Sequence, residues 1–242
     1  MGNVQDAIAE LKNITDAYDN IVFFGGAGVS TESGIPDFRS VDGLYHSTYD
    51  YPPEQIVSHS FYRSKPGEFY RFYKDKMLFP NALPNDAHKK LAELEAKGKV
   101  RAVITQNIDG LHQAAGSRVV LELHGSVLRN YCEDCGAFYD INAILDSPDI
   151  PRCSKCNGPI KPDVVLYEES LDEKTLNAAI RYIHDADVLI IGGTSLAVYP
   201  AAGLIDYFRG DKIVVINKTA TPRDSFADLL IQAPIGQVFK QI

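Results

Sequence analysis

The sequence predicts an α/β fold in which a parallel sheet, with helices on both faces, carries a second and smaller lobe. Three observations lead to this prediction. Short apolar strands alternate with helical segments, a pattern typical of a parallel sheet covered on both faces. Polar or glycine-rich loops follow several of these strands directly. All four cysteines lie in one stretch with little apolar periodicity, which indicates a segment outside the sheet that a bound metal ion stabilises.

The elements of the sheet follow from the spacing of apolar residues. An amphipathic helix is expected first, because apolar residues recur at helical spacing over residues 4–14. A buried strand follows at residues 20–24. The next helix is capped by Asn85 or Asp86 and stops at Gly98. Further strands are expected at residues 100–105, 164–166, 188–191 and 212–216, and further helices at 171–184 and 200–208.

Two stretches interrupt the alternation of strands and helices. Residues 41–83 are rich in Tyr, Phe and Pro, which favours short helices and loops, and residues 126–160 carry the cysteines. We expect these two stretches to form the small lobe. The prediction is thus one domain over residues 1–242, with a sheet-containing core at about 1–40, 84–125 and 161–242.

Length and charge limit the classes of protein that fit. A chain of 242 residues suits one large α/β domain and buries a substantial core. Its formal charge is 24 − 32 = −8, which argues against direct nucleic-acid binding and favours basic partners such as Lys-rich peptides. With no secretory pattern and no run of about 20 apolar residues, we expect a cytoplasmic location and no membrane contact. We also expect a monomer.

The cysteines have the spacing of a zinc ribbon. Cys132-x-x-Cys135 and Cys153-x-x-Cys156 are separated by residues 136 to 152, which is 17 residues. Each pair places two thiolates on one tight turn, and two such turns complete a tetrahedron around Zn²⁺. Surface thiol pairs or a redox dithiol are the alternatives. Since four protein ligands leave no open position, the metal is expected to be structural.

A glycine-rich loop, Gly25-Gly26-Ala27-Gly28, follows the first strand as a phosphate-binding turn does. Small residues let backbone N–H groups approach a pyrophosphate. The full dinucleotide fingerprint is absent, because Thr31 takes the place of a third glycine and no acidic residue follows at the end of a strand. A plain strand-to-loop turn is the alternative.

Further polar groups follow the strands. Residues 30–39 offer a carboxylate, a guanidinium and an aromatic ring, and residues 105–110 follow the next strand. Loops at the carboxyl ends of parallel strands meet at a ligand crevice, although helix capping is an alternative role. His124 follows an apolar strand and precedes Gly125. It is a candidate proton acceptor, with a structural histidine as the alternative.

Five motifs occur in order along the chain: Gly26-Ala27-Gly28-Val29-Ser30-x-x-Ser33-Gly34-Ile35-Pro36-Asp37-Phe38-Arg39, Thr105-Gln106-Asn107-Ile108-Asp109, Leu123-His124-Gly125, the cysteine quartet and Gly193-Thr194-Ser195-Leu196. In this order they resemble the sirtuins, the NAD-dependent protein deacylases, over residues from about 20 to 240. The chain is most similar to the minimal bacterial type. The resemblance implies a Rossmann-like core and a small lobe with a zinc ribbon and a helical module, between which NAD and an acetyl-lysine peptide enter.

The resemblance also implies an activity. NAD is consumed: the acetyl oxygen attacks C1′ of the nicotinamide ribose and nicotinamide leaves. A histidine, His124 here, then acts as general base, which leads to free lysine and O-acetyl-ADP-ribose. Asn107 and Asp109 are implied to hold the ribose and the nicotinamide, and Phe38 to shield the reactive carbon. The implied NAD-binding residues are Ala27, Thr31, Phe38, Arg39, Gln106, Ile108, Asp109, Thr194, Ser195, Asn217 and Ile235.

The acyl-lysine tunnel is expected to be lined by Val164, Val165 and Tyr167, because the lysine stem is apolar once acetylated. Many sirtuins carry Phe-Gly-Glu where this chain has Tyr167-Glu168-Glu169. The missing glycine alters the edge on which the peptide pairs. The added carboxylate of Glu168 is expected to favour substrates flanked by Lys or Arg.

The acyl preference follows from a second departure. Desuccinylating relatives place Ala, Tyr and Arg in the acyl pocket, whereas this chain has Val57, Tyr73 and Lys76 by spacing. Lysine lacks the planar fork that binds a carboxylate through two hydrogen bonds. We therefore expect deacetylation over desuccinylation. A surface lysine on a helix is the alternative reading of Lys76.

Three other functions compete with this reading. A protein mono-ADP-ribosyltransferase would share the NAD site and the first half-reaction. A catalytically silent NAD-binding module is less compatible with His124, Asn107 and Asp109 occurring together. A hydride-transferring dehydrogenase fits least, because the ribose-binding acid is missing.

Overall fold

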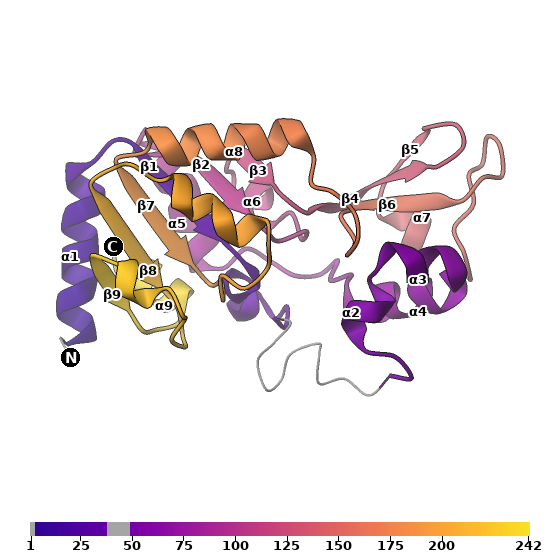
Figure 1. Ribbon diagram of the computed structural model, residues 1–242, viewed down its shortest axis with the longest axis horizontal. Coiled ribbons are helices and arrows are strands. Elements are labelled where there is room, and N and C mark those ends of the chain that lie inside the picture. Colours follow the sequence, from indigo (N-terminus) through magenta and orange to yellow (C-terminus); the bar gives the residue numbers. More distant parts are fainter. Residues whose placement is uncertain (1–2, 38–48) are drawn as a thin grey trace.

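The computed structural model describes residues 3–37 and 49–242. Its centre is a six-stranded parallel sheet in the order β3-β2-β1-β7-β8-β9 (Figure 1). The order reverses between β1 and β7, and open sheets of this kind bind ligands beside such a reversal. The strands are β1 (Ile21–Gly25), β2 (Val100–Thr105), β3 (Val120–Glu122), β7 (Val188–Gly192), β8 (Lys212–Ile216) and β9 (Leu229–Ile231).

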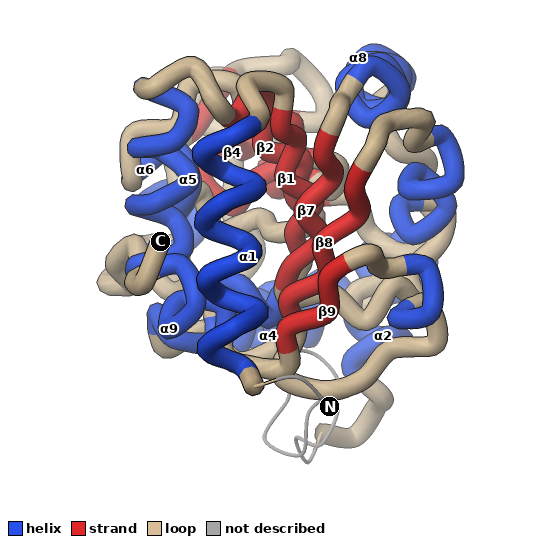
Figure 2. The backbone as a smooth tube through the Cα atoms, turned by 90° about the vertical axis from the view of Figure 1, so that its left-hand side faces the viewer, coloured by secondary structure: helices blue, strands red, loops and turns tan. Residues whose placement is uncertain are grey.

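Helices cover both faces of this sheet, as Figure 2 shows in a view along its layers. Phe23 of β1 faces a core with α1 (Val4–Ala17), α5 (Asp86–Ala96) and α9 (Ile235–Phe239). Its neighbours Val22 and Phe24 face the opposite core with α8 (Glu173–Asp185) and the 3₁₀ helix η4 (Ala201–Tyr207), because side chains alternate along a strand. Shorter helices are η1 (Ala27–Val29), η2 (Thr31–Ser33), α6 (Leu111–Ala114) and η5 (Asp224–Phe226).

A separate apolar core lies at the other end of the molecule, at the right of Figure 1. It is rich in buried aromatic side chains, among them Phe61, Phe69 and Phe72. An antiparallel sheet in the order β5-β4-β6 and a group of short helices share this core. These elements are β4 (Gly125–Cys132), β5 (Phe138–Tyr139), β6 (Ile160–Val164), α2 (Pro53–Ile56), α3 (His59–Ser64), α4 (Pro66–Lys76) and α7 (Asn142–Leu145).

Most of the elements predicted for the main sheet match the structure and two differ, while strand β9 and helix α9 have no counterpart in the prediction. The predicted strand at residues 164–166 is wrong, because the strand there is β6, which ends at Val164 and pairs antiparallel with β4 in the small sheet. The helix predicted at 200–208 is a 3₁₀ helix. Within the residues described, none of the helices combines the length and apolar character that crossing a membrane requires.

Candidate functional site

A cavity of about 1330 Å³ opens at the carboxyl ends of β1, β2, β7 and β8 and extends toward the small sheet. Its wall brings together the predicted NAD, catalytic and substrate residues that the structure describes. Phe38 and Arg39 lie outside the described residues. The predicted residues that line this cavity are Ala27, Thr31, Tyr73, Lys76, Gln106, Asn107, Ile108, Asp109, His124, Val164, Val165, Tyr167, Thr194, Ser195, Asn217 and Ile235.

The glycines after β1 serve the packing of two loops. The N–H of Gly26 donates to the Gly192 carbonyl (3.2 Å) and that of Gly28 to the Gly193 carbonyl (2.8 Å). A Cβ on Gly28 would lie 2.8 Å from the Gly193 Cα, closer than real contacts allow. These two amides are therefore engaged within the chain, and the phosphate-binding role of the loop stays a prediction that would use its other N–H groups.

A buried serine joins two predicted catalytic residues. The Ser30 hydroxyl donates to Asp109 Oδ2 (2.7 Å) and accepts a bond from Asn107 Nδ2 (3.0 Å). Asp109 Oδ1 accepts from the Leu111 N–H (2.9 Å), so both carboxylate oxygens are held. Ser30 is 1% exposed. Sequence reasoning did not assign Ser30 a role; the available signal was its place at the end of the glycine-rich motif.

His124 has the tautomer and protonation state of a base. Its Nδ1 lies 2.9 Å from the Gln106 carbonyl oxygen. Since a carbonyl only accepts, Nδ1 carries the proton and Nε2 is the nitrogen that can accept one. Burial lowers the pKa of His124 below its usual 6.5, and the bond to Gln106 opposes this only in part. The ring is therefore neutral at pH 7.

The loops after β2, β7 and β8 hold one another through side chains. The Gln106 amide donates to Thr194 Oγ1 (3.1 Å). Asn217 and Thr194 exchange two bonds: Asn217 Oδ1 accepts from the Thr194 N–H (3.0 Å), and Asn217 Nδ2 donates to the Thr194 carbonyl (3.1 Å). Both residues are buried. This end of the cavity is thus preorganised before any ligand enters.

The opposite end of the cavity adjoins the short helices and is lined by both apolar and charged side chains. Tyr73 is buried on α4, where its ring stacks on Phe69. The Lys76 ammonium lies 3.1 Å from Asp75 Oδ2, and it also lies over the ring of Tyr49. Its charge already has partners within the protein, which is unfavourable for capture of a distal carboxylate on an acyl chain.

The four cysteines fit a zinc ion. Their sulfur atoms all lie within 4.8 Å of one another, with Cys132 and Cys156 at 3.4 Å and Cys135 and Cys153 at 3.6 Å. A tetrahedron with Zn–S bonds of about 2.3 Å has sulfur separations of roughly 3.8 Å. Disulfides require about 2.05 Å. Because the set is complete and lies outside the lining of the cavity in the described chain, its role is structural.

Comparison with known proteins identifies the family. The model of the Sir2 family matches residues 26–200, which is well over half of the chain. The chain belongs to the Sir2 family. It is 60% identical to an NAD-dependent protein deacetylase of Clostridium perfringens, over 99% of both chains. It is 55% identical to one of Clostridium acetobutylicum, over 98% of both.

Solved Sir2 structures share the fold. A Sir2 complex with a p53 peptide and NAD⁺ superposes with a TM-score of 0.86 at 41% identity, covering 97% of this chain and 96% of that one. A Sir2 complex with deacetylated p53 peptide and 3′-O-acetyl ADP-ribose has a TM-score of 0.89 at 40% identity, with the same coverage. The sirtuin resemblance and the fold class predicted from the sequence are therefore confirmed.

Proposed function

We propose that this chain removes acetyl groups from protein lysines with consumption of NAD, releasing nicotinamide and O-acetyl-ADP-ribose. The observation that carries the proposal is the neutral His124 on the wall of the same cavity as the linked Ser30, Asn107 and Asp109. Relatives named NAD-dependent protein deacetylase support it at 55% and 60% identity. NAD supplies the ADP-ribosyl group that accepts the acetyl group.

Each residue at the reacting end has a role that its contacts support. Nε2 of His124 takes the proton from a ribose hydroxyl, and the Gln106 carbonyl holds the resulting imidazolium at Nδ1. Asn107 and Asp109 hold the ribose and the nicotinamide, with their side chains oriented by Ser30. The remaining contacts to NAD are assigned to Ala27, Thr31, Phe38, Arg39, Gln106, Ile108, Thr194, Ser195, Asn217 and Ile235.

The partner is a protein or peptide that carries acetyl-lysine. Val164, Val165 and Tyr167 line its apolar stem, while Tyr73 and Lys76 face the acyl group. The peptide main chain adds as a strand, which tolerates many sequences. The division into a core (about 1–40, 84–125 and 161–242) and a small lobe (41–83 and 126–160) stays a prediction, as do a cytoplasmic location, a monomeric state and the lack of direct nucleic-acid binding.

The deciding experiment incubates the protein with NAD and an acetyl-lysine peptide, and follows nicotinamide release and peptide mass. We expect nicotinamide release together with loss of one acetyl group. His124→Ala should lower the rate by roughly 10²–10⁴-fold. His184→Ala is the control, because that ring is exposed on α8, and it should match wild type. A peptide that gains ADP-ribose would indicate a transferase, and no nicotinamide release a silent binding module.

A further inference from the structure

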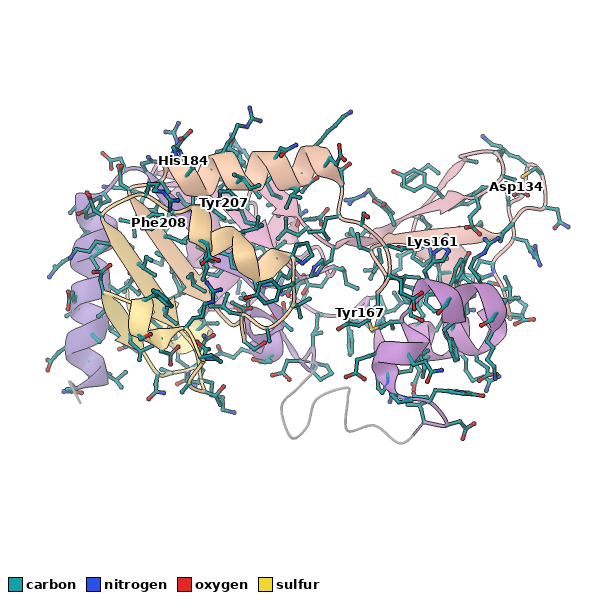
Figure 3. All side chains as sticks on the ribbon, in the orientation of Figure 1. Asp134, Lys161, Tyr167, His184, Tyr207 and Phe208 are labelled. Carbon is teal, nitrogen blue, oxygen red and sulfur yellow. The ribbon has the colours of Figure 1, made fainter. Side chains whose placement is uncertain are left out.

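A segment of five residues, 165–169, crosses from the small sheet to the short helices along the wall of the cavity; we call it the strap. Figure 3 shows Tyr167 of the strap between the main sheet and the helices. At one end, the Val165 N–H donates to the His124 carbonyl (3.0 Å). Farther on, Tyr167 pairs with the chain before α3: its N–H donates to the Val57 carbonyl (3.0 Å) and its carbonyl accepts from the His59 N–H (2.9 Å). The strap thus links the backbone of the proposed base to α3.

Glu168 fastens the strap to α3 through its side chain. Oε2 accepts a bond from the Ser60 N–H (2.8 Å), and Oε1 accepts one from the Ser60 hydroxyl (3.0 Å). Both carboxylate oxygens are thus bound within the protein. The side chain remains exposed and keeps its charge, so the expected preference for substrates flanked by Lys or Arg stays a prediction.

The first turn of α3 explains why the strap docks there. The first three N–H groups of a helix have no partner within it. In α3, the N–H of His59 donates to the Tyr167 carbonyl and that of Ser60 to the Glu168 carboxylate, while that of Phe61 donates to the Ser58 hydroxyl (3.2 Å). Two of the three groups are therefore satisfied by the strap.

Glu169 links the end of the strap to its middle, to β6 and to α3. Its Oε2 accepts from the Leu166 N–H (2.9 Å) and from the Lys161 ammonium (3.2 Å), and its Oε1 lies 2.9 Å from Nδ1 of His59. Figure 3 shows Lys161 on β6, above α3. Lys161 and Glu169 are each only about one-fifth exposed. The strap is therefore held by the side chains of both Glu168 and Glu169.

The backbone of Glu168 has a φ of +76°, in the left-handed region. A side chain with a Cβ adopts this region at a cost in free energy that glycine avoids. The two bonds to Ser60 contribute free energy that acts against this cost. What the carboxylate contributes in the structure is the pair of contacts that anchor the strap on α3.

We propose that Glu168 is a positioning residue for the acyl-lysine peptide. It anchors the strap to α3 and thereby fixes the position of this wall of the cavity relative to His124. The proposal rests on the proposed function, because it assigns the strap to that substrate. It concerns peptide binding more than the chemical step, since Glu168 does not touch the Ser30, Asn107 and Asp109 cluster.

Two substitutions separate the possible roles. Glu168→Gly removes the anchor and relieves the left-handed backbone. Glu168→Gln removes the charge but still bonds Ser60 twice, because its Oε1 accepts from the N–H and its Nε2 donates to the hydroxyl oxygen. We expect Glu168→Gly to raise KM for the acetyl-lysine peptide roughly 5-fold, with kcat and KM for NAD within about twofold of wild type. Glu168→Gln and the control Glu54→Ala, an exposed residue of the neighbouring helix α2, should stay within about twofold of wild type.

A second measurement does not depend on activity. Amide hydrogen exchange of residues 165–169 and of the first turn of α3 should accelerate in Glu168→Gly and stay unchanged in Glu168→Gln. Wild-type exchange and wild-type peptide KM in Glu168→Gly would overturn the anchor, and so would a KM in Glu168→Gln as high as in Glu168→Gly. If the wild type deacetylates nothing, the proposed function fails, while the exchange experiment still tests the anchor.

Discussion

Two buried histidines should make the fold sensitive to mild acid. His88 of α5 and His112 of α6 are 0% and 1% exposed, and their rings pack edge to face with centroids 4.7 Å apart. Among the described residues, neither nitrogen of His112 has a hydrogen-bond partner, nor does Nε2 of His88. Burial lowers the pKa of His88 to about 4, against the pull of Asp109, and that of His112 to about 3.

The sign and size of the effect follow from these pKa values. An unfolded histidine titrates near 6.5, so at lower pH the unfolded chain binds protons that the folded chain excludes. Above about pH 6.5 the two histidines do not reduce the free energy of unfolding. Below that pH the reduction grows as the pH falls, and it levels off only below about pH 3. At pH 5 each histidine costs about 2 kcal/mol, and the pair about 4 kcal/mol. That is a large share of the 5–15 kcal/mol typical of a domain.

Urea unfolding at pH 7.5, 6 and 5 measures this effect. His88→Gln is the informative variant, because His88 Nδ1 accepts the Asn85 N–H in a capping box and a glutamine at that position preserves the motif. Between pH 7.5 and 5, the free energy of unfolding of His88→Gln should fall by about 2 kcal/mol less than that of wild type. The control His184→Gln changes an exposed ring and should follow wild type. Equal losses in His88→Gln and wild type would refute the reasoning.

Three further predictions concern the metal, the buried serine and the acyl group. Chelation of zinc, or Cys153→Ser, should lower the midpoint of thermal unfolding and expose residues 132–156 to cleavage by trypsin, because the free energy of metal binding contributes to folding. An unchanged pattern of cleavage would contradict a structural role of the metal. Ser30→Ala should reduce kcat by about 10–100-fold while the circular dichroism spectrum stays unchanged. The substitution leaves the buried Asn107 amide without its partner, and an unsatisfied buried group costs about 1–3 kcal/mol. Succinyl-lysine peptide should turn over at least about tenfold more slowly than acetyl-lysine peptide, and Lys76→Arg should narrow that gap by supplying a bidentate fork; equal wild-type rates would refute the preference.

Local patterns predicted much of the fold. The strands at residues 100–105 and 212–216 have the predicted bounds, and the helix capped by Asn85 ends just before the predicted stop at Gly98. Apolar runs, caps and left-handed glycines act over a few neighbouring residues, so the sequence displays them directly. The strand near Val164 was misplaced because an apolar run does not reveal which sheet it joins.

Composition and short spacings are enough to predict which side chains are available for chemistry, where most strands of the main sheet lie, and that four cysteines have zinc-ribbon spacing. Three features come from the folded chain instead: how Ser30 joins Asn107 and Asp109, why Gly28 must be small, and where the Glu168 carboxylate points. Each depends on a contact between segments about 80 to 165 residues apart, such as Ser30 with Asp109 and Gly28 with Gly193. The packing of the whole chain sets such contacts, and no local pattern encodes them.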